Sequence, residues 1–274
     1  MKIVALLENT TKNCDLEPRH GLSLYVETKK HKLLVDAGGG EEFARNARKL
    51  GVDLAAVDIA VITHGHSDHG GGLKRFLDIN KTAKVYIQAS AFEPYYKKIK
   101  GFIKAYIGLD KKLKNNPQIV LVNGDMRIDD GICLITNPSQ NDLMPKFNAS
   151  LLEKDGKKVI KDRFNHEQSV IITENKTVLI GGCAHRGIAN IIKDAQLKIK
   201  KPVDVCVSGF HLFDPVSGAV EHEDVIKQLS KLLLAGCTQY YVCHCTGVKA
   251  YEILKTLMKD RINYLATGDV LEVR

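Results

Sequence analysis

A dense group of histidine and aspartate residues constrains this chain more than any other feature of its sequence. Four potential metal ligands lie within six residues: His64, His66, Asp68 and His69. Imidazole nitrogen and carboxylate oxygen are the ligands that suit Zn²⁺ and its first-row neighbours. Residues 57–62 precede the group and read as a buried strand, and residues 73–77 follow it and read as the first turns of a helix. We therefore expect the group in a loop between two rigid elements, as a precise metal site requires.

The spacing of this group predicts how its members share metal ions. Residues i and i+2 point the same way in an extended or loop backbone, so His64 and His66 can bind one ion together. Asp68 and His69 then turn toward a second position nearby. The chain has ten histidines in 274 residues, so a surface loop with coincidental histidines is the weaker interpretation. Residues 70–72 are all glycine, which lets a backbone approach a ligand closely and make tight turns where other residues would clash.

Apolar segments of strand length alternate with helical patterns along the chain, and this predicts an α/β protein. The expected strands are residues 2–7, 22–28, 32–36, 57–62, 84–88, 119–122, 132–135, 150–153, 158–160, 167–173, 177–182, 202–208, 238–243, 263–265 and 270–273. The expected helices are residues 41–50, 73–77, 188–197, 223–235 and 248–258. No repeat, low-complexity segment or flexible linker interrupts the pattern, and we expect a single domain over residues 1–274.

Residues 91–147 break this rhythm and combine aromatic side chains with many lysines. The aromatic residues are Phe92, Tyr95, Tyr96, Phe102 and Tyr106. One interpretation is an insertion over the active site, in which the rings provide a stacking surface and the lysines contact phosphate. The other is helical packing with a solvated face, and for any single residue here this second interpretation has more weight.

Composition favours a small anionic partner and a reducing compartment. The net charge is +8 and the pI about 9.0, which attracts anions, although the lysine runs at residues 97–100, 111–114 and 198–201 read as solvated faces. The seven cysteines are scattered and odd in number, which favours a cytoplasmic, reduced protein over a disulfide framework. We find no signal peptide, no apolar run near the roughly 20 residues that span a bilayer, and no RNA-binding appendage. We therefore expect neither a membrane nor a nucleic-acid partner, and the oligomeric state is open.

Three more histidines stand where a strand gives way to a helix or loop. They are His185, His211 and His244. Each lies at one edge of the expected sheet, which is the topology that would bring them to the metal loop. One such residue alone would be an ordinary polar histidine, but three of them together with the first group strengthen the prediction of a metal site.

The motif His64-x-His66-x-Asp68-His69 after a hydrophobic strand resembles the signature of the metallo-β-lactamase superfamily. That resemblance implies a four-layer αββα sandwich, here with an inserted subregion, and usually two metal ions at one edge. Residues 181–188, 209–212 and 244–247 follow the order seen in one branch of the superfamily, and residues 8–9, 21–24 and 36–38 agree with it. This branch includes archaeal enzymes resembling 7,8-dihydropterin-6-methyl-4-(β-D-ribofuranosyl)aminobenzene-5′-phosphate synthase, and many members are called metal-dependent hydrolases. The resemblance covers nearly the whole chain.

Carried over residue by residue, the resemblance implies two sets of metal ligands. The first set is His64, His66 and His185, and the second is Asp68, His69 and His244. The expected cofactor is a divalent metal, zinc first with manganese or iron as alternatives, as one or two ions.

Two residues leave the ligand set open. Cys183 stands near the place where the superfamily usually has a bridging aspartate, so either Cys183 is a thiolate ligand or water alone bridges the ions, and a single ion becomes an alternative. His166, just before a strand, competes with His185 as third ligand, and we favour His185 from its setting in residues 183–187.

Further residues receive roles beside the metal. We read His211 as a pocket residue that contacts a substrate phosphate or acts as acid or base, with a satisfied strand-end histidine as the alternative. Asp36 either accepts a hydrogen bond from a ligand histidine or a loop amide, or merely ends a strand. Asp68 would orient the nucleophile as well as bind metal. The remaining histidines are expected on the surface: His20, His31 and His222.

The function that these predictions favour is a metal-dependent hydrolase acting on a small phosphorylated substrate through a metal-bound hydroxide. The first alternative is a dihydropterin-alkylating transferase, a synthase in which an aromatic aminobenzene acceptor displaces pyrophosphate from a dihydropterin. The second alternative is an iron-containing redox protein or a non-catalytic metal-binding protein. His66 argues against the iron proteins of this fold, which usually have Glu at that position. A nuclease ranks low.

Overall fold

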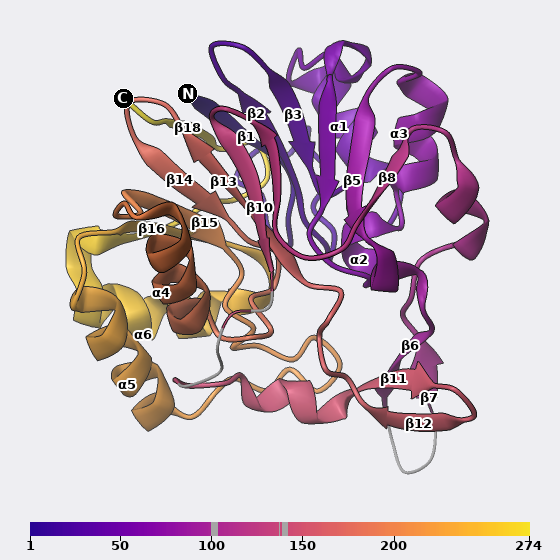
Figure 1. The fold of residues 1–274 in the computed structure, drawn as a ribbon. Helices are drawn as coiled ribbons and strands as arrows, with labels where there is room; N and C mark the ends of the chain where they lie inside the picture. Colours follow the sequence, from indigo (N-terminus) through magenta and orange to yellow (C-terminus); the bar gives the residue numbers. More distant parts are fainter. Residues whose placement is uncertain (100–103, 137, 139–141) are drawn as a thin grey trace. The chain divides into compact units, whose positions relative to one another are not determined.

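The computed structural model describes residues 1–99, 104–136, 138 and 142–274 (Figure 1). The chain divides into two compact units, which we call unit 1 and unit 2. Unit 1 consists of Met1–Gly124, Ser150–Gln168 and Ala266–Arg274, and unit 2 of Asp125–Ala149 and Ser169–Leu265. Phe102 and Lys100, two residues of the expected aromatic and basic insertion, lie outside the described residues.

Unit 1 is built on a seven-stranded mixed sheet. Its order is β18-β1-β2-β3-β4-β5-β8, antiparallel from β18 to β3 and parallel from β3 to β8. Parallel neighbours need a crossover, which the helix α1 (Glu42–Lys49) provides between β3 and β4 and the helix α3 (Leu73–Ile79) between β4 and β5. The strands are β1 (Lys2–Leu7), β2 (Ser23–Glu27), β3 (Lys32–Val35), β4 (Ile59–Ile62), β5 (Lys84–Gln88), β8 (Ile119–Val122) and β18 (Val270–Glu272).

The core of unit 1 forms between one face of this sheet and its two crossover helices. Alternate residues of the strands, such as Ala60 and Ile62, share a hydrophobic cluster with Phe43 of α1 and Phe76 of α3. This is the period-2 pattern of a strand meeting the period-3.6 pattern of a helix. The packing fixes the end of β4, and the metal-binding motif starts immediately after it.

A second, smaller sheet belongs to unit 1. Its order is β12-β11-β6-β7 and all its pairs are antiparallel. The strands are β6 (Tyr95–Lys98), β7 (Lys104–Tyr106), β11 (Leu151–Asp155) and β12 (Lys158–Lys161). The hairpin of β11 and β12 matches the strands expected at residues 150–153 and 158–160, whereas β6 and β7 were not expected. Figure 1 shows the four strands gathered at one end of the unit.

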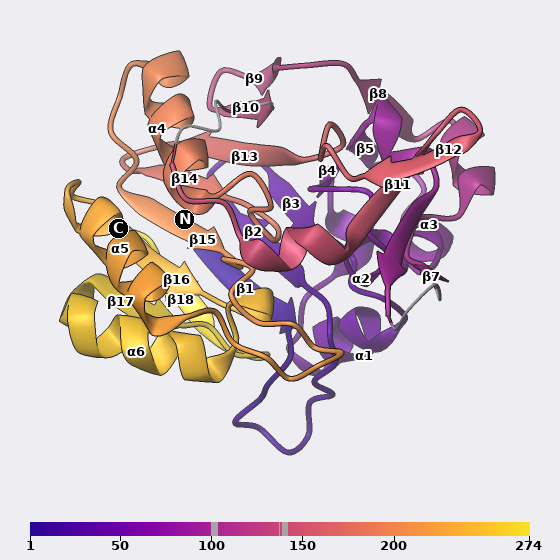
Figure 2. The same ribbon diagram turned by 90° about the horizontal axis from the view of Figure 1, so that it is seen from below.

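Unit 2 has its own seven-stranded mixed sheet and three helices. The order is β17-β16-β15-β14-β13-β10-β9, and the strands from β14 to β17 are parallel. The crossovers are α4 (Ile188–Ile199), α5 (Glu223–Leu234) and α6 (Val248–Met258), which Figure 2 shows beside β14 to β17. The strands are β9 (Met126–Asp129), β10 (Ile132–Thr136), β13 (Gln168–Thr173), β14 (Thr177–Ile180), β15 (Val205–Ser208), β16 (Gln239–Val242) and β17 (Ile262–Tyr264).

The parallel arrangement of unit 2 places three strand ends at one sheet edge. Because neighbouring parallel strands end on the same side, the segments that follow β14, β15 and β16 meet there. These segments carry His185, His211 and His244. The prediction that the three histidines lie at one edge of a sheet is confirmed.

The predicted α/β class is confirmed, with some differences in detail. The two C-terminal strands, β17 and β18, join different sheets rather than each other. The expected insertion at residues 91–147 is divided between the two units: residues 91–124 belong to unit 1 and residues 125–147 to unit 2. Its position over an active site and the single domain over residues 1–274 stay predictions. None of the described helices has the length and apolar character needed to cross a membrane.

Candidate metal centre

The predicted metal motif follows β4 directly, but part of it is helical. Ser67–Gly70 form the one-turn helix α2, with His66 at its N-cap position. The carbonyl of His66 accepts hydrogen bonds of 3.1 Å from the backbone N–H groups of His69 and Gly70. The expectation of a plain loop was therefore wrong for Asp68 and His69, because four polar residues are too few to show helical periodicity in sequence.

Unit 1 brings its four predicted ligands together. One ligand atom each of His64, His66 and Asp68 lie within 4.8 Å of one another. The ring centroids of His64 and His69 are 4.1 Å apart, and His69 Nε2 lies 3.8 Å from a carboxylate oxygen of Asp68. The three imidazoles are buried, whereas the Asp68 side chain is 25% exposed and can reach solvent. The arrangement is that of a metal site, and metal binding by these four residues stays a prediction.

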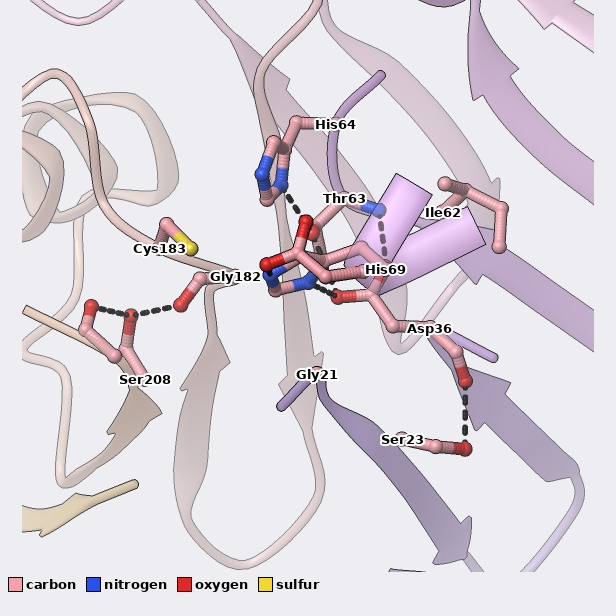
Figure 3. A network of polar contacts seen from close by, with 12 residues as sticks. Gly21, Ser23, Asp36, Ile62, Thr63, His64, His69, Gly182, Cys183 and Ser208 are labelled. Atoms are coloured by element: carbon pink, nitrogen blue, oxygen red, sulfur yellow. Dashed lines mark hydrogen bonds and ion pairs between the residues drawn. The ribbon is translucent and has the colours of Figure 1, made fainter. Parts of the chain in front are cut away.

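Asp36 forms hydrogen bonds with His69 and with Thr63, the residue before the motif (Figure 3). Its Oδ2 accepts a hydrogen bond from His69 Nδ1 at 2.6 Å, and its Oδ1 accepts one from the Thr63 N–H at 2.7 Å. Asp36 has a φ of 60°, and its carbonyl accepts a hydrogen bond from Ser23 Oγ at 2.8 Å. The prediction that Asp36 binds a motif histidine and a loop amide is confirmed on both counts, and the alternative of a mere strand end is wrong.

Thr63 links Asp36 to a second histidine, His64, through two hydrogen bonds. The Thr63 hydroxyl donates to Asp36 Oδ2 at 2.7 Å, so its oxygen is left to accept from His64 Nδ1, which lies 3.0 Å away. Both His64 and His69 therefore carry their proton on Nδ1 and present the Nε2 lone pair. That is the protonation state a metal ligand needs, and a hydrogen-bonded carboxylate raises the basicity of the ligating nitrogen. The donor set thus fits a divalent ion.

The glycine run at residues 70–72 serves the packing of two loops. A Cβ at Gly72 would overlap the carbonyl oxygen of Ala37, and Gly72 N–H donates to the Gly38 carbonyl at 2.9 Å. Ala37 N–H donates to the carbonyl of His69 at 2.7 Å. The expectation that these glycines stand where other residues would clash is confirmed, because the loop that follows Asp36 lies backbone to backbone against the motif. The expectation that they let the backbone approach a ligand stays a prediction.

His166, the rival third ligand, is used for another purpose. Its Nδ1 accepts a hydrogen bond from the Gly65 N–H at 2.9 Å, so its proton sits on Nε2, 3.1 Å from Asp162 Oδ2. Both ring nitrogens are engaged, and His166 supports the motif backbone. A Cβ at Gly65 would come within 2.5 Å of the Ala91 carbonyl oxygen, so only glycine fits at this point of the motif.

Asp162 is a buried residue beside the motif whose place there could not be predicted from the sequence. Its carboxylate lies between His166 and His66, with His66 Nε2 at 3.5 Å. Burial alone would raise the pKa of Asp162. The neighbouring His166 and His66 lower this pKa by more than burial raises it, so it falls below its usual range. The ring of Tyr95 packs on His166 at 4.1 Å between centroids, and burial raises the pKa of Tyr95.

His20 has a closer relation to the site than expected. It is exposed, as predicted, yet its Nε2 lies 3.2 Å from Asp68 Oδ2. His31 is half-buried and pairs with Asp58 at 3.1 Å, and only His222 is a plain surface residue. The contact between His20 and Asp68 could not be predicted, because the two residues are distant in sequence.

In unit 2 the loop after β14 carries Cys183 and His185. The carbonyl of Gly182 accepts hydrogen bonds from Gly209 N–H at 2.8 Å and Ser208 Oγ at 3.2 Å, which ties this loop to the end of β15 (Figure 3). Asn148, which was not predicted as a site residue, contacts His185 through both polar atoms of its side chain. Its Oδ1 lies 3.0 Å from His185 Nδ1, and its Nδ2 donates to the His185 carbonyl at 2.7 Å. His185 therefore also presents Nε2.

The other two strand ends bring His211 and His244 to the same edge. Both are buried and have left-handed backbone angles, with φ of 51° and 50°. The rings of His185 and His211 are 4.4 Å apart between centroids. Burial raises the pKa of Cys245, but hydrogen bonding to Cys183 and His211 and the charges of His244 and His211 bring it well below its usual range. The proposed roles of His185, His211 and His244 stay predictions.

Comparison with known proteins agrees with this arrangement. Residues 16–144 match the model of the metallo-beta-lactamase superfamily. The 7,8-dihydropterin-6-methyl-4-(beta-D-ribofuranosyl)-aminobenzene-5'-phosphate synthase of Methanocaldococcus jannaschii is 26% identical over 99% of this chain and 96% of its own length. A solved metal-dependent hydrolase of the β-lactamase superfamily is 29% identical with a TM-score of 0.83, covering 100% of this chain and 99% of that chain. An isothiocyanate hydrolase from Delia radicum gut bacteria shares the fold at 15% identity and a TM-score of 0.57, over 100% and 99% of the two chains.

These matches extend over both units. The predicted metallo-β-lactamase fold is confirmed in the form of two mixed sheets flanked by helices. The predicted resemblance to the branch with the archaeal synthase and metal-dependent hydrolases is confirmed as well. The chain therefore resembles the metallo-β-lactamase superfamily in sequence over residues 16–144, and its fold is the fold of that superfamily.

Proposed function

We propose that this protein is a metal-dependent hydrolase that cleaves a small anionic substrate, with a phosphate ester as the first candidate. The observation that carries the proposal is the hydrogen-bond network of Asp36. It orients the ring of His69 directly and that of His64 through Thr63, so that each ring presents the lone pair of Nε2. The likeness to a metal-dependent hydrolase over the full chain supports it. The net charge of +8 favours an anionic substrate.

The residues of unit 1 that would hold a divalent ion are His64, His66, Asp68 and His69, and the superfamily resemblance adds His185 and His244 of unit 2. When bound, such an ion polarises a phosphoryl oxygen and makes water more acidic. The Asp68 carboxylate is the exposed member of the set, so it can accept a hydrogen bond from the attacking water and orient it. His20 at 3.2 Å would hold that carboxylate in place.

A second function has a specific observation in its favour. The relative of 26% identity over 99% of this chain is a synthase of a dihydropterin-methyl aminobenzene phosphate. In the corresponding reaction the acceptor attacks the methylene carbon of a dihydropterin, and the carbon–oxygen bond to pyrophosphate breaks. Pyrophosphate carries the negative charge away, and metal-binding residues suit such a leaving group.

The deciding experiment measures pyrophosphate release from 6-hydroxymethyl-7,8-dihydropterin pyrophosphate by zinc-loaded protein, with and without the ribofuranosylaminobenzene phosphate acceptor. A panel of phosphomonoesters and phosphodiesters is assayed in parallel. His64 and His66 are both changed to alanine in the test variant. The matched control changes His31 and His222, two histidines away from the motif, to alanine.

Each outcome points to one function. Phosphoester hydrolysis, or pyrophosphate release without acceptor, that is lost in the test variant and kept in the control supports the hydrolase. Pyrophosphate release that requires the acceptor supports the synthase instead. Turnover that survives in the test variant contradicts both, because the metal motif would then be dispensable.

We also propose that the protein works in the reducing cytoplasm. No disulfide joins any of the seven cysteines, all of which lie in the described part of the chain. Two of them, Cys14 and Cys237, are exposed. Exposed thiols are better tolerated where glutathione and thioredoxin keep them reduced.

A further inference from the structure

Unit 2 contains a second group of metal-binding side chains that the proposed hydrolase reaction does not use. Cys183, His211 and Cys245 each offer one ligand atom, and these three atoms lie within 4.8 Å of one another. Cys183 follows β14, His211 follows β15 and Cys245 follows β16, so three parallel strands deliver the group to one sheet edge. All three residues are buried, at 2–7% exposure.

We propose that Cys183, His211 and Cys245 bind one thiophilic metal ion, with Zn²⁺ as the first candidate, in addition to any ion at the histidine motif. Two thiolates and one imidazole are a recognised zinc set, and sites with three protein ligands keep a fourth position open. Thiolate ligands select zinc, copper(I) and iron over magnesium and calcium. This inference goes beyond the proposed hydrolase function and does not depend on it.

The imidazole of His211 points to a ligand independently of the cysteines. It is 93% buried, because its exposed fraction is 7%. Within the described part of the chain, neither of its ring nitrogens makes a well-formed hydrogen bond. A buried polar group without such a bond is costly, of the order of 1–3 kcal/mol. A metal ion bound at one nitrogen would remove part of that cost.

A backbone N–H group is directed at the sulfur of Cys245. The His211 backbone N–H donates to Cys245 Sγ at 3.2 Å, a bond that supports negative charge on sulfur. The loop of Cys183 is fixed by the hydrogen bonds of the Gly182 carbonyl, and Phe210 N–H donates to Thr246 Oγ1 at 3.0 Å. The three ligand-bearing loops are thus tied to one another before any ion binds, which lowers the entropy cost of assembling the site.

The test uses cobalt(II) as a spectroscopic substitute for zinc in the full-length protein. A thiolate bound to Co²⁺ gives a near-ultraviolet charge-transfer band whose strength follows the number of thiolates. We expect this band in the wild type, a decrease of about twofold in C183S and in C245S, and no band in the double variant. In H211A we expect the band to need more than about tenfold higher Co²⁺ concentration.

Three controls keep the result unambiguous. C206A removes a buried cysteine of β15 outside the group and should leave the band unchanged. The variant with His64 and His66 changed to alanine should also keep it. A full band in C245S, a band that disappears with the two motif histidines, or no band in the Co²⁺-loaded wild type would each overturn the proposal. If a cysteine variant fails to fold, the absence of a band in the wild type and the Co²⁺ titration of H211A still test the proposal.

Discussion

The carboxylate of Asp36 and the imidazole of His69 share a hydrogen bond of 2.6 Å, with both side chains fully buried. The bond fixes the ring so that Nε2 is its free lone-pair nitrogen. Asp36 directly follows β3 and His69 lies in α2, so the bond also joins the end of β3 to the helical part of the metal motif.

Replacing Asp36 by asparagine should weaken zinc binding about 10- to 100-fold, the range found when a partner of a ligand histidine is lost. The amide can no longer accept hydrogen bonds at both positions, so the His69 ring loses its orientation. Competition titration with a zinc chelator measures the affinity. The control is D58N, which removes the carboxylate of an Asp–His pair of unit 1 that lies outside the metal motif, between Asp58 and His31. Equal affinity in D36N and the wild type would contradict the prediction.

Thr63 offers a test of the relay to His64. T63V keeps the shape of the side chain and removes the hydroxyl that joins Asp36 Oδ2 to His64 Nδ1. We expect zinc affinity to fall about tenfold and the free energy of unfolding to fall by about 1–3 kcal/mol, because buried groups lose their partner. T63S retains the hydroxyl and should remain within a few-fold of the wild type. Identical values for T63V and T63S would exclude the relay.

His166 should prove a support and not a ligand. H166A leaves the Gly65 N–H and the buried Asp162 carboxylate without the bonds that His166 supplies. The free energy of unfolding should fall by about 2–5 kcal/mol, as for a broken buried pair. The number of zinc ions per chain, counted by native mass spectrometry, should stay at the wild-type value under saturating zinc. Loss of one ion from the folded variant would instead make His166 a ligand.

Gly65 should not tolerate a larger residue. In G65A the new Cβ would lie 2.5 Å from the Ala91 carbonyl oxygen and 2.9 Å from Tyr95 Cε2, so the backbone must shift. Overpacking of this kind costs about 1–3 kcal/mol and would displace the neighbours His64 and His66. Thermal unfolding and zinc titration measure both effects. G236A is the matched control, since a Cβ there meets no atom within 4 Å, and equal stability of the two variants would contradict the account.

Sequence reasoning predicted most elements because their patterns are local. The strand before the motif is an unbroken apolar run, and α4, α5 and α6 have helical spacing. It missed α2, whose four residues are too few for a period, and β6 and β7, whose lysines and tyrosines give little alternation. For the C-terminal strands it found β17 and β18 but could not assign their sheets, because pairing depends on contacts far along the chain.

In the candidate site, too, local sequence patterns were predictable and contacts between distant residues were not. The motif from His64 to His69 was visible because its spacing is local, and Asp36 could be suspected from its place after a strand. The bonds of Asp162 and His166 with the motif were not, since they join residues about 100 positions apart. Asn148 and His20 were missed for the same reason.

The measurement that most directly tests the central claim is hydrolysis of the phosphoester panel by chelator-stripped protein as zinc is added back. We expect no turnover without metal, recovery in the wild type in step with zinc bound per chain, and no recovery in the variant with His64 and His66 changed to alanine. Turnover by the metal-free wild type, or full recovery in that variant, would contradict the account.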